Sequence, residues 1–148
     1  MRFISHRGNL RGIEPANENR PEYLLHAISE GFEVEADLWR VKEEWFLGHD
    51  EPQYKISEEF LLHDKMWCHA KNINAFENLL ELNTKCFWHQ TDDYTLTSNG
   101  FIWAYPGSEL TSLCICVLPE RFPDEFQNSE ICAGICSDYI EVYRKKND

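Results

Sequence analysis

FISHRGN, at residues 3–9, is the segment that says most about how this chain folds. It begins with two apolar residues, as a core strand does, but it continues with an imidazole (His6), a permanent cation (Arg7) and a glycine (Gly8). A strand that is buried on both faces usually consists of Val, Ile and Leu throughout. The segment therefore predicts a strand whose end delivers a proton carrier and a positive charge to a site.

Strand-like and helix-like segments alternate in the first half of the chain. Apolar runs typical of strands occur at 3–6, 32–39, 45–50, 66–71, 85–90, 101–105, 112–120 and 131–140. Helical patterns occupy 21–30, 74–82 and, more weakly, 57–62, and Asn74 and Glu77 have the spacing of a capping box. This alternation predicts βα units around a parallel sheet, although the later strands are too close together for full crossover helices.

The bulk properties predict one globular domain, residues 1–148, and exclude several classes of partner. The formal net charge of −12 argues against binding to nucleic acid or to an anionic membrane. The sequence contains no run of about 18 apolar residues for a membrane span and no signal-peptide pattern. We therefore expect a cytoplasmic protein whose six cysteines are reduced and behave as small apolar side chains, with a zinc site or disulfides as alternatives.

The segment FEVEADLW, residues 32–39, places acidic side chains on one face of a strand. Because side chains alternate along a strand, Glu33, Glu35 and Asp37 point to the same side. This face is either exposed to solvent at the edge of the sheet or it binds a divalent cation through Glu35 and Asp37. The repulsion between like charges favours the cation, because a cation would neutralise them. Mg²⁺ and Ca²⁺ prefer such oxygen ligands.

Two further segments carry titratable groups near the acidic strand in sequence. WFLGHD, residues 45–50, ends in His49, so two strand-end histidines flank the acidic strand like an acid and a base beside a metal. In MWCHAK, residues 66–71, alternation places His69 and Lys71 on one face. A buried lysine needs an anionic partner, which is either a phosphate or the carboxylates of the acidic strand.

The motifs HRG (6–8), ENR (18–20), EAD (35–37), GHD (48–50), HAK (69–71) and GICSDY (134–139) occur in this order. Together they resemble the glycerophosphodiester phosphodiesterase family, most closely in the first fifty residues. The resemblance implies an α/β fold, a compact or incomplete TIM-type (β/α) barrel. Because a full barrel of this type has about 250 residues, several helices must be missing.

The resemblance also implies a function and a set of site residues. It implies a metal-dependent phosphodiesterase that acts on a small glycerophosphodiester-like substrate, in which a neighbouring hydroxyl attacks phosphorus and leaves a cyclic phosphate. The residues carried over are His6 and His49 as acid and base, Arg7, Lys71 and Asn19 for the phosphate, and Glu35 and Asp37 for the metal. His69 stands where the family has a third carboxylate ligand, so the expected metal is Mg²⁺ or Ca²⁺, with Mn²⁺ or Zn²⁺ as the alternatives that an imidazole ligand favours.

Several alternatives remain open from the sequence. One alternative is a phospholipase-type member of the same superfamily. Another is a non-catalytic descendant that binds a phosphorylated ligand or a protein. Glu120 is either a substitute metal ligand or a loop residue. His89 either faces the pocket or is a hydrogen-bonded structural histidine, and Trp103 and Tyr105 either line a substrate cleft or belong to the core.

Overall fold

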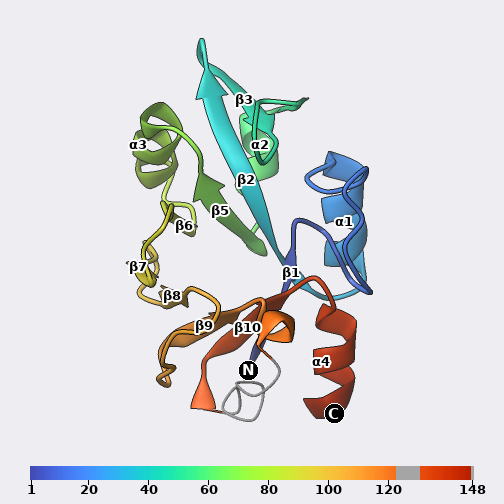
Figure 1. Ribbon diagram of the computed structural model, residues 1–148. Helices are drawn as coiled ribbons and strands as arrows, with labels where there is room; N and C mark the ends of the chain where they lie inside the picture. Colours follow the sequence, from blue (N-terminus) through green and yellow to red (C-terminus); the bar gives the residue numbers. More distant parts are fainter. Residues whose placement is uncertain (123–130, 148) are drawn as a thin grey trace.

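The structure, a computed structural model, describes residues 1–122 and 131–147. Within them, ten strands form one sheet that curls into a half-barrel, and α-helices cover its outer side (Figure 1). The α/β class expected from the sequence is therefore confirmed, and the curled sheet is consistent with an incomplete barrel. No helix among the described residues is both long and apolar enough to cross a membrane.

The central strands of the sheet are parallel. In spatial order they are β8 (Ile102–Ala104), β9 (Cys114–Val117), β10 (Gly134–Ser137), β1 (Arg2–His6), β2 (Glu33–Val41), β5 (Met66–Ala70) and β6 (Cys86–Phe87). The FISHRGN segment thus supplies the strand in the middle, between β10 and β2. Because these strands run in the same direction, their C-terminal ends meet at one edge of the curled sheet, where α/β folds place their sites.

Three short strands are antiparallel, which differs from the expected pattern. The strands β3 (Glu44–Leu47) and β4 (Tyr54–Ile56) continue from β2 as hairpins, and β7 (Tyr94–Leu96) pairs with β8. The 45–50 segment is therefore a returning hairpin strand and not a member of the parallel core. The return brings Gly48 beside β2, where its N–H donates to the carbonyl of Asp37 at 3.1 Å.

The helices are α1 (Pro21–Ser29), α2 (Glu58–Leu61), α3 (Ile73–Glu81) and α4 (Ile140–Asn147). The first three confirm the predicted helical segments, whereas α4 was not predicted. The predicted cap at Asn74 is wrong, because this residue lies inside the first turn of α3. Asn72 caps the helix instead, in extended backbone conformation, and its side chain accepts a hydrogen bond from Ala75 N–H at 2.9 Å.

Alternation along the strands separates two apolar layers. Outward side chains such as Val34, Ala36 and Leu38 belong to a cluster that includes residues of all four helices. Inward side chains form a smaller cluster inside the curled sheet, which includes Ile4, Trp67, Phe87, Trp103 and Ile115. All six cysteines are free and buried, as expected for small apolar side chains. The acidic side chains of β2 therefore lie on the inner face, not on a solvated edge.

Candidate active site

A cavity of about 490 Å³ lies at the C-terminal edge of the parallel strands. Its lining includes many of the residues proposed from the sequence, namely His6, Arg7, Glu35, His49, His69 and Lys71. The other two proposed residues, Asn19 and Asp37, are buried and hydrogen-bonded to each other, with Asn19 Nδ2 donating to Asp37 Oδ2 at 2.9 Å. The fold thus gathers the proposed residues, which are far apart in sequence, around one site.

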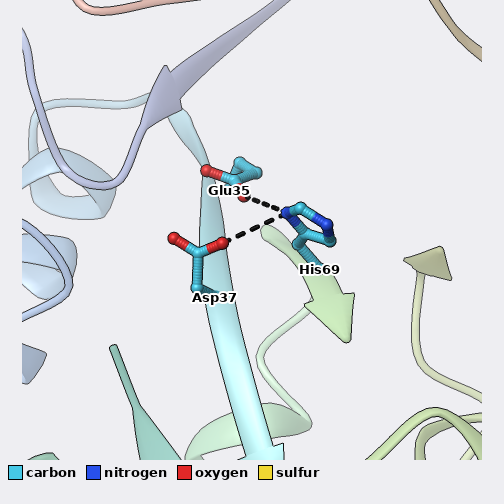
Figure 2. A group of neighbouring side chains, drawn as sticks. All are labelled: Glu35, Asp37 and His69. Atoms are coloured by element: carbon cyan, nitrogen blue, oxygen red, sulfur yellow. Dashed lines mark ion pairs between the residues drawn. The ribbon is translucent and has the colours of Figure 1, made fainter. Parts of the chain in front are cut away.

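Glu35, Asp37 and His69 form a compact group that could hold a metal ion (Figure 2). One ligand atom from each lies within 4.8 Å of the others. The two carboxylates share the inner face of β2, and the parallel pairing sets Asp37 opposite His69 of β5. As a result, His69 Nδ1 lies 3.1 Å from Asp37 Oδ1 and 3.6 Å from Glu35 Oε1.

The chemistry of this group fits a divalent cation. His69 Nε2 lies 2.9 Å from the carbonyl oxygen of His89, which can only accept, so Nε2 carries a proton. The ring would bind a metal through Nδ1, which faces the two carboxylates, once Nδ1 has lost its own proton. Two buried carboxylate oxygens, Glu35 Oε2 and Asp37 Oδ1, have no hydrogen-bond partner among the described residues. Two carboxylates and one imidazole suit Mn²⁺ and Zn²⁺ as well as harder cations.

Without a cation, the buried carboxylates are balanced by an internal ion-pair network. Arg7 Nε lies 3.1 Å from Asp37 Oδ2, and Lys71 Nζ lies 3.6 Å from Asp37 Oδ1. Burial by itself raises the pKa of Asp37, but His69 and the two cations outweigh it and hold that pKa far below its usual range. Burial alone lowers the pKa of His69, but Asp37 and Glu35 raise it to about 9. The salt-bridged arrangement anticipated for Lys71 is therefore present.

The loops after β1 are held in strained backbone conformations beside this group. Arg7 and Asn19 both have positive φ, 54° and 60°, which costs a non-glycine residue about 1–3 kcal/mol. Hydrogen bonds hold them there: Arg7 N–H donates to the Glu35 carbonyl at 3.0 Å, and Asn19 N–H donates to the Arg7 carbonyl at 3.1 Å. Asn19 Oδ1 in turn accepts from Asp37 N–H at 3.0 Å, so the strain positions both side chains on Asp37.

The two histidines proposed as acid and base, His6 and His49, are oriented in the same way. His6 Nδ1 lies 2.7 Å from Asp138 Oδ1, and His49 Nδ1 lies 2.7 Å from Asp50 Oδ1. An aspartate on Nδ1 fixes the ring and leaves Nε2 to exchange protons. His6 is buried, whereas the His49 side chain is 41% exposed. Burial alone lowers the pKa of His6, but the Asp138 hydrogen bond and the Glu35 charge outweigh it and raise that pKa.

Gly48 places His49 at the cavity. Its φ is +150°, and a Cβ added there would lie 2.0 Å from the carbonyl oxygen of Glu51, so a larger residue would displace the turn. The Gly48 carbonyl accepts a hydrogen bond from Trp39 Nε1 at 2.7 Å. The turn is therefore pinned to β2 on both sides of the glycine.

The structure adds Asp138 and Asn9, to which the sequence assigned no site role, and shows where Glu120 lies. Asp138 orients His6, and its carboxylate also accepts a hydrogen bond from Asn9 Nδ2 at 2.8 Å. Glu120 accepts from Ser137 Oγ at 2.9 Å and from Asp138 N–H at 3.0 Å, so it holds the turn that carries Asp138 and is not in the candidate metal group. Their position in the sequence could have indicated these two residues, because Asp138 directly follows the last strand and Asn9 closely follows the first.

The remaining wall of the cavity is aromatic and polar. His89, Trp103 and Tyr105 line it, so the cleft alternative holds for them, and Trp103 belongs to the inner core as well. Gln90 and Arg121, which the sequence did not single out, also line it. The chain matches no protein-family model, and no similar curated protein or solved structure was found. Function must therefore be inferred from the chemistry of this cavity.

Proposed function

We propose that the protein is a metal-dependent phosphodiesterase that hydrolyses a small glycerophosphodiester-like substrate by acid and base catalysis with two histidines. One observation supports this most directly. His6 and His49, each with Nδ1 next to an aspartate, line the same cavity as the cations Arg7 and Lys71. Such a cavity meets the two demands of phosphodiester cleavage, proton transfer and stabilisation of negative charge on the phosphoryl oxygens.

The substrate phosphate binds between Arg7 and Lys71 in this proposal. Both cations pair with Asp37 and also line the cavity, so they can turn from the carboxylate to a phosphate that enters it. A divalent cation held by Glu35, Asp37 and His69 would act as a Lewis acid on the phosphoryl group and share the carboxylate charge. Arg7 adds geometry, since its planar guanidinium can donate two parallel hydrogen bonds to one phosphate.

The histidines carry the protons. One imidazole takes the proton of the attacking substrate hydroxyl as its oxygen bonds to phosphorus. The other imidazole gives a proton to the leaving oxygen as its bond to phosphorus breaks. Their roles reverse when water opens the resulting cyclic phosphate. Asp138 and Asp50 keep each Nε2 available and stabilise the imidazolium that forms, because each carboxylate remains on Nδ1.

A turnover assay with a matched pair of histidine variants tests the proposal. The substrate is the p-nitrophenyl ester of glycerol phosphate, which has the neighbouring hydroxyl and releases a coloured phenol. We expect His49→Ala to lower kcat by about two to four orders of magnitude. His63→Ala is the control, because His63 is 39% exposed, its Nδ1 lies 3.2 Å from Asp64, and it does not line this cavity. This control should keep the parent rate.

The metal requirement is tested with the same substrate. Chelator should abolish turnover, and Mg²⁺, Ca²⁺, Mn²⁺ or Zn²⁺ should restore it. Undiminished turnover by protein shown to be metal-free would refute the metal mechanism. Phosphate binding without turnover with any of the four metals would instead favour the non-catalytic phosphate-binding alternative.

A further inference from the structure

One wall of the cavity takes no part in the proposed reaction. It comes from the C-terminal ends of β6 and β8 and includes His89, Gln90 and Tyr105. A phosphate and a glycerol group would fill only part of a 490 Å³ cavity, which is within the size range of sites for larger ligands. This wall therefore has room for a second group of the substrate.

The His89 side chain points to a polar ligand. Both of its ring nitrogens are shielded from solvent, yet neither has a hydrogen-bond partner among the residues that the structure describes. Leaving buried polar groups unpaired carries a free-energy cost. A rotation of the ring towards the cavity, with a ligand hydroxyl as partner, would remove this cost. A hydroxyl suits the imidazole in either charge state, because it can both donate and accept.

The ring of Tyr105 supplies an apolar surface beside His89. Its centroid lies 5.5 Å from that of His89, and its side chain is partly open to solvent, with an exposed fraction of 44% for the residue. The Tyr105 backbone is held by its N–H, which donates to the Asp93 carbonyl at 2.8 Å. Trp103, which also lines the cavity, stacks on Phe87 with 4.4 Å between the ring centroids.

An exposed aromatic face next to hydrogen-bonding groups fits a sugar ring. One face of a pyranose consists of C–H groups that pack on an aromatic ring, while its edge carries hydroxyls. An acyl chain would pack on Tyr105 but leave the His89 nitrogens without partners. Glycerol alone has hydroxyls but no ring face to cover the tyrosine.

We propose that His89, Gln90 and Tyr105 form a subsite for a sugar ring, so that the substrate is a phosphodiester in which one alcohol is a saccharide. This inference rests on the proposed function for the placement of the phosphate at Arg7 and Lys71. The sugar ring lies against Tyr105, and its hydroxyls bond to His89 and to the exposed amide of Gln90.

Titration calorimetry with product-like probes tests the subsite without turnover. Glucose 1-phosphate should bind at least about tenfold more tightly than glycerol 3-phosphate, because it adds an aromatic contact and hydrogen bonds. Tyr105→Ala should remove this preference and leave the affinity for inorganic phosphate unchanged. Tyr94→Ala is the matched control, since Tyr94 is also 44% exposed, lies on the adjacent β7 and does not line the cavity. This control should keep the preference.

His89→Phe separates a binding role from a structural one. The variant keeps a ring of similar shape but removes the unpaired nitrogens, so its Tm should equal or exceed that of the parent while its preference for glucose 1-phosphate is lost. A lower Tm with the preference intact would overturn the role of His89.

The outcomes for the subsite and for the proposed function differ. If the protein prefers glucose 1-phosphate but turns over no phosphodiester, the subsite proposal stands and the proposed phosphodiesterase activity is rejected. If the protein turns over the p-nitrophenyl ester but binds glucose 1-phosphate and glycerol 3-phosphate equally well, the proposed activity stands and the subsite proposal is overturned. Tighter binding of adenosine 5′-monophosphate than of glucose 1-phosphate would also overturn it, in favour of a nucleoside.

Discussion

Asp138 links the last strand of the sheet to the first through its hydrogen bond with His6. Burial alone raises the pKa of Asp138, but the hydrogen bond to His6 and the charge of His6 outweigh it and lower that pKa. Because the folded-state pKa is the lower one, the carboxylate stabilises the fold above its unfolded pKa of about 3.9, and this contribution is lost as the pH falls through the folded value.

Asp138→Asn should therefore lower the free energy of unfolding at pH 7 by about 1.5–3 kcal/mol, the value of a hydrogen bond to a charged group. The difference between parent and variant should shrink below about pH 4, as the parent carboxylate takes up its proton. Urea unfolding at several pH values measures this, with Asp64→Asn as an exposed control. A difference that stayed constant down to pH 2 would contradict the assigned pairing.

His69 is the residue on which metal preference depends. Because it contributes a neutral imidazole where a carboxylate would add a negative charge, the parent should prefer Mn²⁺ or Zn²⁺ to Ca²⁺. His69→Glu should raise the affinity for Ca²⁺, because it adds a carboxylate oxygen and a negative charge to the group. Calorimetric titration of both proteins with each metal measures this, and equal Ca²⁺ affinities would show that His69 is not a ligand.

Among the elements, the hairpin of β2 and β3 matters most for the site. A parallel crossover would carry the chain away from β2, whereas the hairpin returns it to the level of Asp37 within a few residues. The Gly48 turn then projects His49 towards the cavity. The two histidines proposed as acid and base, His6 and His49, thus come from one parallel strand end and one hairpin return.

The start of α3 offers a direct comparison of two possible caps. Asn72→Ala should lower the free energy of unfolding by about 0.5–2 kcal/mol or more, because the side chain caps Ala75 N–H and also bonds to Arg40. Asn74→Ala should have little effect, because this side chain is exposed in the first turn. Thermal or urea unfolding of both variants checks the assignment, and a larger loss for Asn74→Ala would reverse it.

For the whole molecule, the positive charges at one cavity contrast with a net charge of −12. Arg7, Lys71 and His69 pair with the buried carboxylates of β2, so positive charge is concentrated beside this cavity. An anionic ligand that enters the cavity can pair with Arg7 and Lys71 there. A cation that enters the group must displace the proton of His69, because in the metal-free protein its pKa is raised to about 9.

Metal binding should consequently stabilise the whole fold and release close to one proton per ion at pH 7. At a free metal concentration of about one hundred times Kd, stabilisation should reach about 2.7 kcal/mol, with a higher Tm. Apparent affinity should rise with pH until about pH 9, where His69 is deprotonated without the metal. Calorimetry in buffers of different ionisation enthalpy counts the protons, and a count of zero would contradict displacement of the His69 proton.

The sequence by itself determined the features that depend on neighbouring residues. Alternation along β2 sets Glu35 and Asp37 on one face whatever surrounds the strand, and the same rule sets His69 of β5 on the side of Lys71, which directly follows that strand. The class of fold and three of the helices follow from equally local patterns. The order of the motifs also indicated the candidate site residues, which the structure gathers around one cavity. Their chemical roles do not follow from that order.

Only the tertiary structure decided which of these faces meet and which groups complete them. The register of β2 against β5 sets Asp37 opposite His69, and the pairing of β1 with β10 brings Asp138 to His6 across 132 positions of sequence. No local sequence pattern predicts which strands pair or in what register. Both depend on how the inner and outer apolar layers pack over the whole sheet. The hairpin return of His49 and the choice of Asn72 as the cap follow from the same cause, contacts that exist only once the sheet has formed.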